Sequence, residues 1–167
     1  HVDAQARAQI VFGALQQFVE RAHPSVTALA RPRERIRGCA LGQPSNHTNY
    51  YGLAFGGSEL DGAGQNYLYF LVAQDGTFLV KHRAGDATHD VVAKTPSDAV
   101  KKPDASGKSV NALEVRVHAD KIEFAVNGTV VGSTPKSGMA AKTDGLYGIR
   151  INHQLEVHID GLAVTKG

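Results

Sequence analysis

The sequence has 167 residues, of which 42% are hydrophobic and 20% are charged, so it can form one globular domain with its own core. No apolar run approaches the ~20 residues of a membrane-spanning helix, and we expect no membrane span. The net charge of +2 is too small to indicate a nucleic-acid-binding surface. Because Cys39 is the only cysteine, an intrachain disulfide and a zinc site of several thiolates are excluded.

The first 49 residues differ from the rest of the chain in charge and pattern. They carry six arginines, no lysine and three acids, whereas the remaining residues have a small acidic excess. Apolar residues at helical spacing between residues 9 and 22 predict an amphipathic helix that ends before Pro24, although residues 12–21 could instead form a strand. The arginines at alternate positions from 31 to 37 fit one face of a strand, and Pro32 favours an edge position for it.

Strand patterns follow one another from residue 50 onward. Residues 50–56 form a short apolar run, and residues 67–74 and 77–83 flank Asp75-Gly76, which predicts a hairpin with a two-residue turn. In residues 111–119, Leu113, Val115 and Val117 alternate with polar residues, as expected of a half-buried strand.

The last third of the chain continues this pattern. Residues 122–126 and 129–131 flank the turn signal Asn127-Gly128, and residues 145–151 and 155–164 predict two closing strands. Residues 86–107, which contain Pro96 and Pro103, predict a long loop that crosses between sheets. Closely spaced strands without intervening helices predict an all-β antiparallel sandwich or barrel.

Four segments together resemble a known superfamily. "YYGLAFGG", "NYLYFLVAQDGTFLVKHRAGD", "NALEVRVHADKIEFAVNGTVVGS" and "DGLYGIRINHQLEVHIDGLAV" are similar to the concanavalin A-like lectin/glucanase superfamily. More closely, they resemble small exported bacterial domains related to the 3-keto-disaccharide hydrolase-like group. The resemblance covers residues 50–165 and implies an antiparallel jelly-roll β-sandwich, with one N-terminal helix as an addition.

The resemblance also has implications for the domain organisation. We expect a single domain over residues 1–167, of which residues 1–49 are an atypical arginine-rich part. If residues 22–24 correspond to the loop that such domains carry before the first apolar strand, residues 25–49 are an insertion.

One motif resembles part of a catalytic signature of glucanases. Glu59, Asp61 and Gly64 align with the E-x-D-x-x-E signature of sandwich-fold glucanases, whose two glutamates act as nucleophile and acid/base. Gly64 replaces the second glutamate, and the surrounding glycines predict a loop. The sequence therefore favours a turn over a catalytic strand at this point.

The ligand-binding candidates are polar and aromatic residues on the predicted strands. Sugars stack their C–H faces on aromatic rings, and this chain has no tryptophan, so tyrosines would have to serve. The resemblance implies that a glycan would lie on the concave sheet. The candidates are Tyr67, Tyr69, Glu114, Arg116, His118, Glu123, Arg150 and Glu156; a core position for the tyrosines and a solvated face for the charged residues are the alternatives.

No metal or cofactor is expected, although calcium and copper are possible ligands. Asp86 and Asp90 could offer oxygens to calcium, and His82 and His89 lie close to them in the sequence. His1 could chelate copper if it is the mature N-terminus. Neither arrangement has a recognised ligand spacing. The sequons at Asn46 and Asn127 are interpreted as turns.

We therefore predict a non-catalytic, carbohydrate-associated or interaction module of a bacterium, secreted or periplasmic after removal of an export signal. The partners expected are a glycan or another protein, with neither nucleic acid nor a membrane. One alternative is a glycoside hydrolase of the 3-keto-disaccharide type, which would need Glu114, Glu123, Glu156 and His118 to converge. The other is a structural or assembly domain that makes contact through its arginine-rich segment.

Overall fold

A computed structural model describes residues 36–39, 48–152, 156–159, 161–162 and 164. The helix predicted over residues 9–22, most of the arginine-rich segment and His1 lie outside the described residues. Within them, no helix is long and apolar enough to cross a membrane. The strands are β1 (Ile36–Cys39), β2 (Tyr50–Ser58), β3 (Asn66–Ala73), β4 (Thr77–Ala84), β5 (Ala87–Pro96), β6 (Lys108–Asn111), β7 (Leu113–Val117), β8 (Lys121–Val126), β9 (Thr129–Pro135), β10 (Leu146–Asn152) and β11 (Glu156–Ile159). One short 3-10 helix, η1 (Gly138–Ala140), precedes β10.

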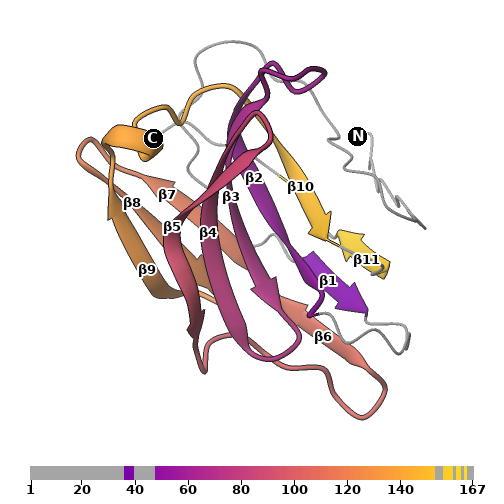
Figure 1. Cartoon of the computed structure of the whole chain (residues 1–167). Coiled ribbons are helices and arrows are strands. Elements are labelled where there is room, and N and C mark those ends of the chain that lie inside the picture. The colour runs from indigo at the N-terminus through magenta and orange to yellow at the C-terminus, as the bar shows by residue number, and fades with distance from the viewer. Residues whose placement is uncertain (1–35, 40–47, 153–155, 160, 163, 165–167) are drawn as a thin grey trace, which may run out of the picture.

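The strands form an antiparallel β-sandwich, which confirms the predicted fold class. One layer is a five-stranded sheet in the order β10-β2-β3-β4-β5, and the other contains the sheet β7-β8-β9 (Figure 1). A further sheet, β11-β1-β6, adjoins this second layer, because only Ala112 separates β6 from β7. All the strand pairs are antiparallel, so each sheet can present one apolar and one polar face.

The main hydrophobic core fills the space between the two layers. Phe70 of β3 and Phe124 of β8 are fully buried, with ring centroids 5.3 Å apart. Leu113, Val115 and Val117 of β7 are buried, as their alternation predicted.

Two turns show how the local sequence sets the strand register. The Asn127-Gly128 turn is confirmed: Val126 pairs with Thr129, and both turn residues have positive φ, 52° and 85°. This conformation twists a two-residue turn in the same sense as the strands. At the other hairpin the prediction was wrong, because β3 and β4 are joined by the three residues 74–76, of which Gly76 alone has positive φ. The Gly76 N–H donates to the Ala73 carbonyl, so the loop is a turn followed by a glycine bulge.

Two strand predictions need correction. Residues 87–96 form the edge strand β5, not a loop; only residues 97–107 cross between the sheets. A mostly exposed edge strand shows little apolar alternation, and Pro96 is tolerated because it ends the strand. The four residues of β1 lie between β11 and β6, so this described part of the arginine-rich segment is not an edge strand; Pro32 lies upstream of the paired residues.

The crossing loop is fastened to the core by the side chain of Asn111, which is 1% exposed. Its carbonyl oxygen accepts hydrogen bonds from the Lys101 N–H (2.9 Å) and from the Asn127 amide (3.0 Å). Its own amide donates to the Tyr51 hydroxyl (2.8 Å) and to the Lys101 carbonyl (3.2 Å). One buried carboxamide therefore joins the five-stranded sheet, the loop and the β8–β9 turn.

Asn111→Ala should lower the free energy of unfolding by about 3 kcal/mol, because it leaves buried backbone groups of the loop without their partner. Urea denaturation measures this loss. The matched change Gln65→Ala, at a half-buried amide in another loop, should cost less than about 1 kcal/mol. Equal costs for the two variants would contradict the role assigned to Asn111.

Asp75, in the β3–β4 loop, is ion-paired with Lys94 of β5 at 2.6 Å. Partial burial acts to raise the pKa of Asp75, but hydrogen bonds from Lys94 and Thr77 outweigh it and hold the pKa below its usual value. A folded-state pKa below the unfolded one means that the stabilisation is present above pH 3.8 and is lost as the pH falls further. Since the two side chains are 44% and 38% exposed, the contribution is at most about 1 kcal/mol.

Asp75→Asn should therefore reduce stability at neutral pH, and its difference from the wild type should shrink in acid. Urea denaturation at neutral pH and well below pH 3.8 measures both differences. Asp61→Asn, an equivalent change in an exposed loop, serves as the control. A difference that is the same at both pH values would show that the turn geometry, and not the charge, is what Asp75 contributes.

Candidate functional site

The structure distributes the eight predicted ligand-binding residues over different sheets. Tyr67, Tyr69 and Arg150 belong to the five-stranded sheet. The backbone of Glu156 lies in β11. The remaining four, Glu114, Arg116, His118 and Glu123, lie on or beside β7 and β8. Arg150 is therefore not brought together with these four residues.

The alternation of β3 separates its tyrosines from the main core. Leu68 and Phe70 point into the main core, whereas Tyr67 and Tyr69 join a second cluster on the opposite face of the sheet. This second cluster also contains Ala54, Leu71 and Leu79. Because Tyr67 and Tyr69 are only 1% and 3% exposed, their rings offer no open platform on which a sugar could stack.

Arg150 of β10 covers these rings. Its guanidinium carbon lies 4.2 Å from the ring centroid of Tyr69 and 5.5 Å from that of Tyr67, within the range of cation–π attraction. One terminal N–H donates to the Tyr67 hydroxyl, and Nε donates to Asn152 Oδ1 at 3.0 Å. The guanidinium is therefore fixed in place before any ligand arrives.

Small residues allow the Arg150 side chain of β10 to reach across β2 to the tyrosines of β3. β2 separates β10 from β3, and Gly52 is the β2 residue that pairs with Arg150. Ala54, the next β2 residue on this face, pairs with Tyr69 on one side and with Gly148 on the other. None of these three small residues projects a long side chain between Arg150 and the tyrosines.

The polar row continues onto β4 and β5. Lys81 pairs with Tyr69 and Arg83 pairs with Tyr67, so both cations lie on the same face as the tyrosines. Lys81 forms an ion pair with Asp90 at 3.0 Å, and Arg83 one with Asp86 at 3.6 Å. We call Tyr67, Tyr69, Lys81, Arg83, Asp90 and Arg150 the arginine–tyrosine face.

The charges of three cations act on the Tyr69 side chain. Burial raises the pKa of Tyr69, and the charges of Arg150, Lys81 and Arg83 oppose this rise only in part. The phenol therefore stays protonated. Because Lys81 and Arg83 are paired with Asp90 and Asp86, Arg150 is the cation of this face that has no acidic partner among the described residues.

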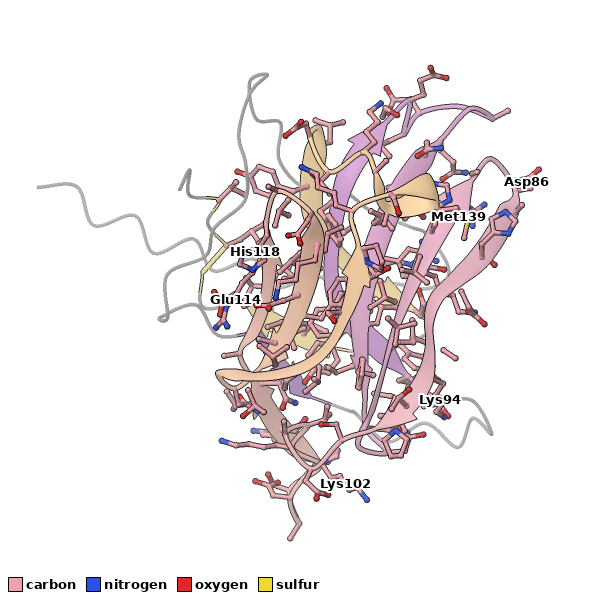
Figure 2. The ribbon with its side chains drawn as sticks, turned by 90° about the vertical axis from the view of Figure 1, so that its left-hand side faces the viewer. Asp86, Lys94, Lys102, Glu114, His118 and Met139 are labelled. Carbon is pink, nitrogen blue, oxygen red and sulfur yellow. The ribbon has the colours of Figure 1, made fainter. Side chains whose placement is uncertain are left out.

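The other candidates form a second group, the β7–β8 charged strip, made of Glu114, Arg116, His118, Lys121 and Glu123. Arg116 donates to Glu114 at 2.7 Å, while Glu123 contacts Lys121 at 2.7 Å and His118 at 3.2 Å. Figure 2 shows Glu114 and His118 on the same side of the molecule. Hydrogen bonds from Lys121 and then from His118 lower the pKa of Glu123, so this carboxyl is a poor proton donor.

The glucanase-like motif occupies a turn, as predicted. Glu59 has a φ of 53°, and its carbonyl accepts the Gly62 N–H at 3.2 Å. A strand that faced a cleft would need extended backbone at this point. Glu59 and Asp61 therefore do not form the strand-borne carboxylate pair of a retaining glucanase.

Among the described residues, those considered as ligands for a metal ion lie on and beside the β4–β5 hairpin. Asp86, at the tip of the β4–β5 hairpin in Figure 2, and Asp90 each face a cation. No group of three or more histidine, cysteine or acidic side chains gathers among the residues that the structure describes. His82 and His89 face one another across β4 and β5.

Sequence reasoning missed Lys81 and Arg83, and it named Asp90 only as an oxygen ligand for calcium. The alternation of residues 77–83 already puts Lys81 and Arg83 on the face opposite Phe78 and Val80, so a closer inspection of that strand would have found them. Asp90 carried no such signal, because its strand was interpreted as a loop.

No family model and no curated protein match the sequence, but solved structures do. The carbohydrate-binding module CBM66 from Bacillus subtilis is 11% identical, with a TM-score of 0.54 over 94% of this chain and 93% of that one. A β-glucanase from Bacillus licheniformis is 10% identical, with a TM-score of 0.53 over 87% of this chain and 69% of that one. A variant of human galectin-16 is 12% identical, with a TM-score of 0.50 over 90% and 99%. The chain therefore has the concanavalin A-like lectin/glucanase fold that the sequence resemblance implied.

Proposed function

We propose that the protein is a non-catalytic carbohydrate-associated module that binds an acidic saccharide on its arginine–tyrosine face. Two of the solved structures with this fold and a TM-score above 0.5 are a carbohydrate-binding module and a β-glucanase, which supports a glycan as the ligand class. The export expected from the sequence is part of the same proposal.

The observation that carries the proposal is the fixed position of Arg150. Its guanidinium is held by Tyr67, Tyr69 and Asn152, so little side-chain entropy remains to be lost when a ligand binds. A planar guanidinium can donate two parallel hydrogen bonds to a carboxylate, which is the charged group of uronic acids. Arg150 is half-buried, so part of it is accessible to a ligand.

The charge of the arginine–tyrosine face favours an acidic ligand over a neutral one. Of the three cations Arg150, Lys81 and Arg83, two are paired with acids: Lys81 with Asp90 and Arg83 with Asp86. Arg150 forms no ion pair within the part of the chain that the structure describes. A carboxylate bound beside Arg150 would meet net positive charge. Because these groups are partly exposed, we expect the affinity to fall as salt is added.

The surroundings of Glu114 and Glu123 favour binding over hydrolysis. Glycoside hydrolysis needs a carboxylic acid whose pKa is raised so that it can protonate the leaving group. Glu114 is paired with Arg116, and Glu123 has a lowered pKa between Lys121 and His118. The lowered pKa keeps Glu123 ionised, which is the wrong state for a general acid.

Titration calorimetry with an oligogalacturonate, compared with a neutral galactan oligomer of equal length, tests the proposal. The acidic oligomer should bind, and Arg150→Gln should weaken its binding at least tenfold, because the bidentate charged contact is lost. Arg116→Gln, which removes an arginine from the β7–β8 charged strip on the other layer, should leave binding unchanged.

Lys81→Gln, on another strand of the same face, provides a second variant in case the Arg150 change disturbs folding. It should also weaken binding, and it should not make the dependence of the affinity on salt any steeper. Binding that is lost equally in the Arg116 variant would place the ligand elsewhere. Release of reducing sugar from either oligomer would contradict the non-catalytic part of the proposal.

A further inference from the structure

The β4–β5 hairpin places two histidines directly opposite one another. Gly85 and Asp86 form its two-residue turn, and Gly85 has the positive φ, 57°, that such a turn needs at its first position. From this turn the register runs through Ala84–Ala87 and Arg83–Thr88 to His82–His89. The two imidazole rings are stacked, with centroids 6.3 Å apart and an interplanar angle of 25°.

His82 has one ring nitrogen whose partner is missing. The side chain is 9% exposed, and Nε2 lies 3.0 Å from Asn66 Oδ1, which can only accept a hydrogen bond. Nε2 therefore carries the proton, and Nδ1 presents a lone pair. Nδ1 is buried and has no hydrogen-bond partner within the part of the chain that the structure describes. Most buried polar atoms are satisfied, so this lone pair calls for an explanation.

The surroundings keep this lone pair free of a proton. Burial, followed by the nearby His89, lowers the pKa of His82. The cations Lys81 and Arg83 lie on the opposite face of β4, and Asp86 lies at the tip of the hairpin (Figure 2). A neutral imidazole with an available nitrogen is the form that binds metals.

We propose that His82 Nδ1 and one ring nitrogen of His89 together bind a divalent transition-metal ion, with Cu²⁺ bound most tightly. Imidazole ligands suit copper, nickel and zinc, and Cu²⁺ has the highest affinity of the divalent series. His89 is exposed, so its ring can turn toward the buried nitrogen while water fills the remaining coordination positions. Asn66 fixes the tautomer of His82, which is the usual role of a group behind a metal ligand.

This site is independent of the arginine–tyrosine face. His82 alternates with Lys81 and Arg83 along β4, so it lies on the core side of the sheet, where Phe78 and Val80 are buried. The metal would therefore join the β4 and β5 strands at the rim of the sandwich. Glycan binding and metal binding can each fail without the other.

Copper titration of the whole chain, read by calorimetry and by pulsed electron paramagnetic resonance, tests the inference. The chain has eight histidines, so other weak sites are expected, and the comparison between variants decides. His89→Ala should remove one bound Cu²⁺ equivalent and the two-imidazole spectroscopic signature. His118→Ala, an exposed histidine on the other layer, should remove neither.

A change in Asn66 makes the test sharper. Asn66→Asp gives Nε2–H a charged acceptor, which increases the basicity of the imidazole, and the affinity for Cu²⁺ should rise about tenfold. A histidine with a purely structural role would show no such gain. Equal copper binding by the wild type and the His89 variant, or equal losses in the His89 and His118 variants, would overturn the inference.

Discussion

The position of the two layers depends on one buried carboxamide, that of Asn111. The loop over residues 97–107 carries the chain from β5 to β6, and Val100 brings it into the main core. Its backbone groups leave water there and need partners, which Asn111 provides at Lys101. Through Tyr51 and Asn127 the same side chain reaches both layers. The sandwich is thus joined at this end by directional hydrogen bonds as well as by apolar packing.

A second feature of this architecture is that β3 buries residues of hydrophobic clusters on both faces of the five-stranded sheet. β3 contributes Phe70 to the main core and Tyr69 to the second cluster, so neighbouring residues of one strand pack on opposite faces of the sheet. The outer cluster gives Arg150 a rigid aromatic base, and the small residues Gly52 and Ala54 leave it room. Because these rings hold the guanidinium of Arg150 in place, a ligand that binds there costs the side chain little conformational entropy.

Local patterns predicted much of this fold. The alternation of Leu113, Val115 and Val117 predicted the buried face of β7, and Asn127-Gly128 predicted the β8–β9 turn, because both depend on neighbours in sequence. β5 was missed, since an exposed edge strand need not alternate. The candidate residues Tyr67, Tyr69 and Arg150 were identified, but not their contact: the pairing of β10 with β2 is set by packing between distant segments, and no local pattern encodes it. For the two tyrosine rings the sequence left an exposed platform and a core position open, and their burial in the second cluster agrees with the core position.

The hydrogen bond between Arg150 and Tyr67 joins residues 83 positions apart. Hairpins such as β3–β4 and β8–β9 close over short loops, whereas β10 must find β2 across most of the domain. During synthesis, β10 leaves the ribosome after β2 and β3. The tyrosines are therefore synthesised before the arginine that covers them, and the contact between Arg150 and Tyr67 can form only after β10 has been made.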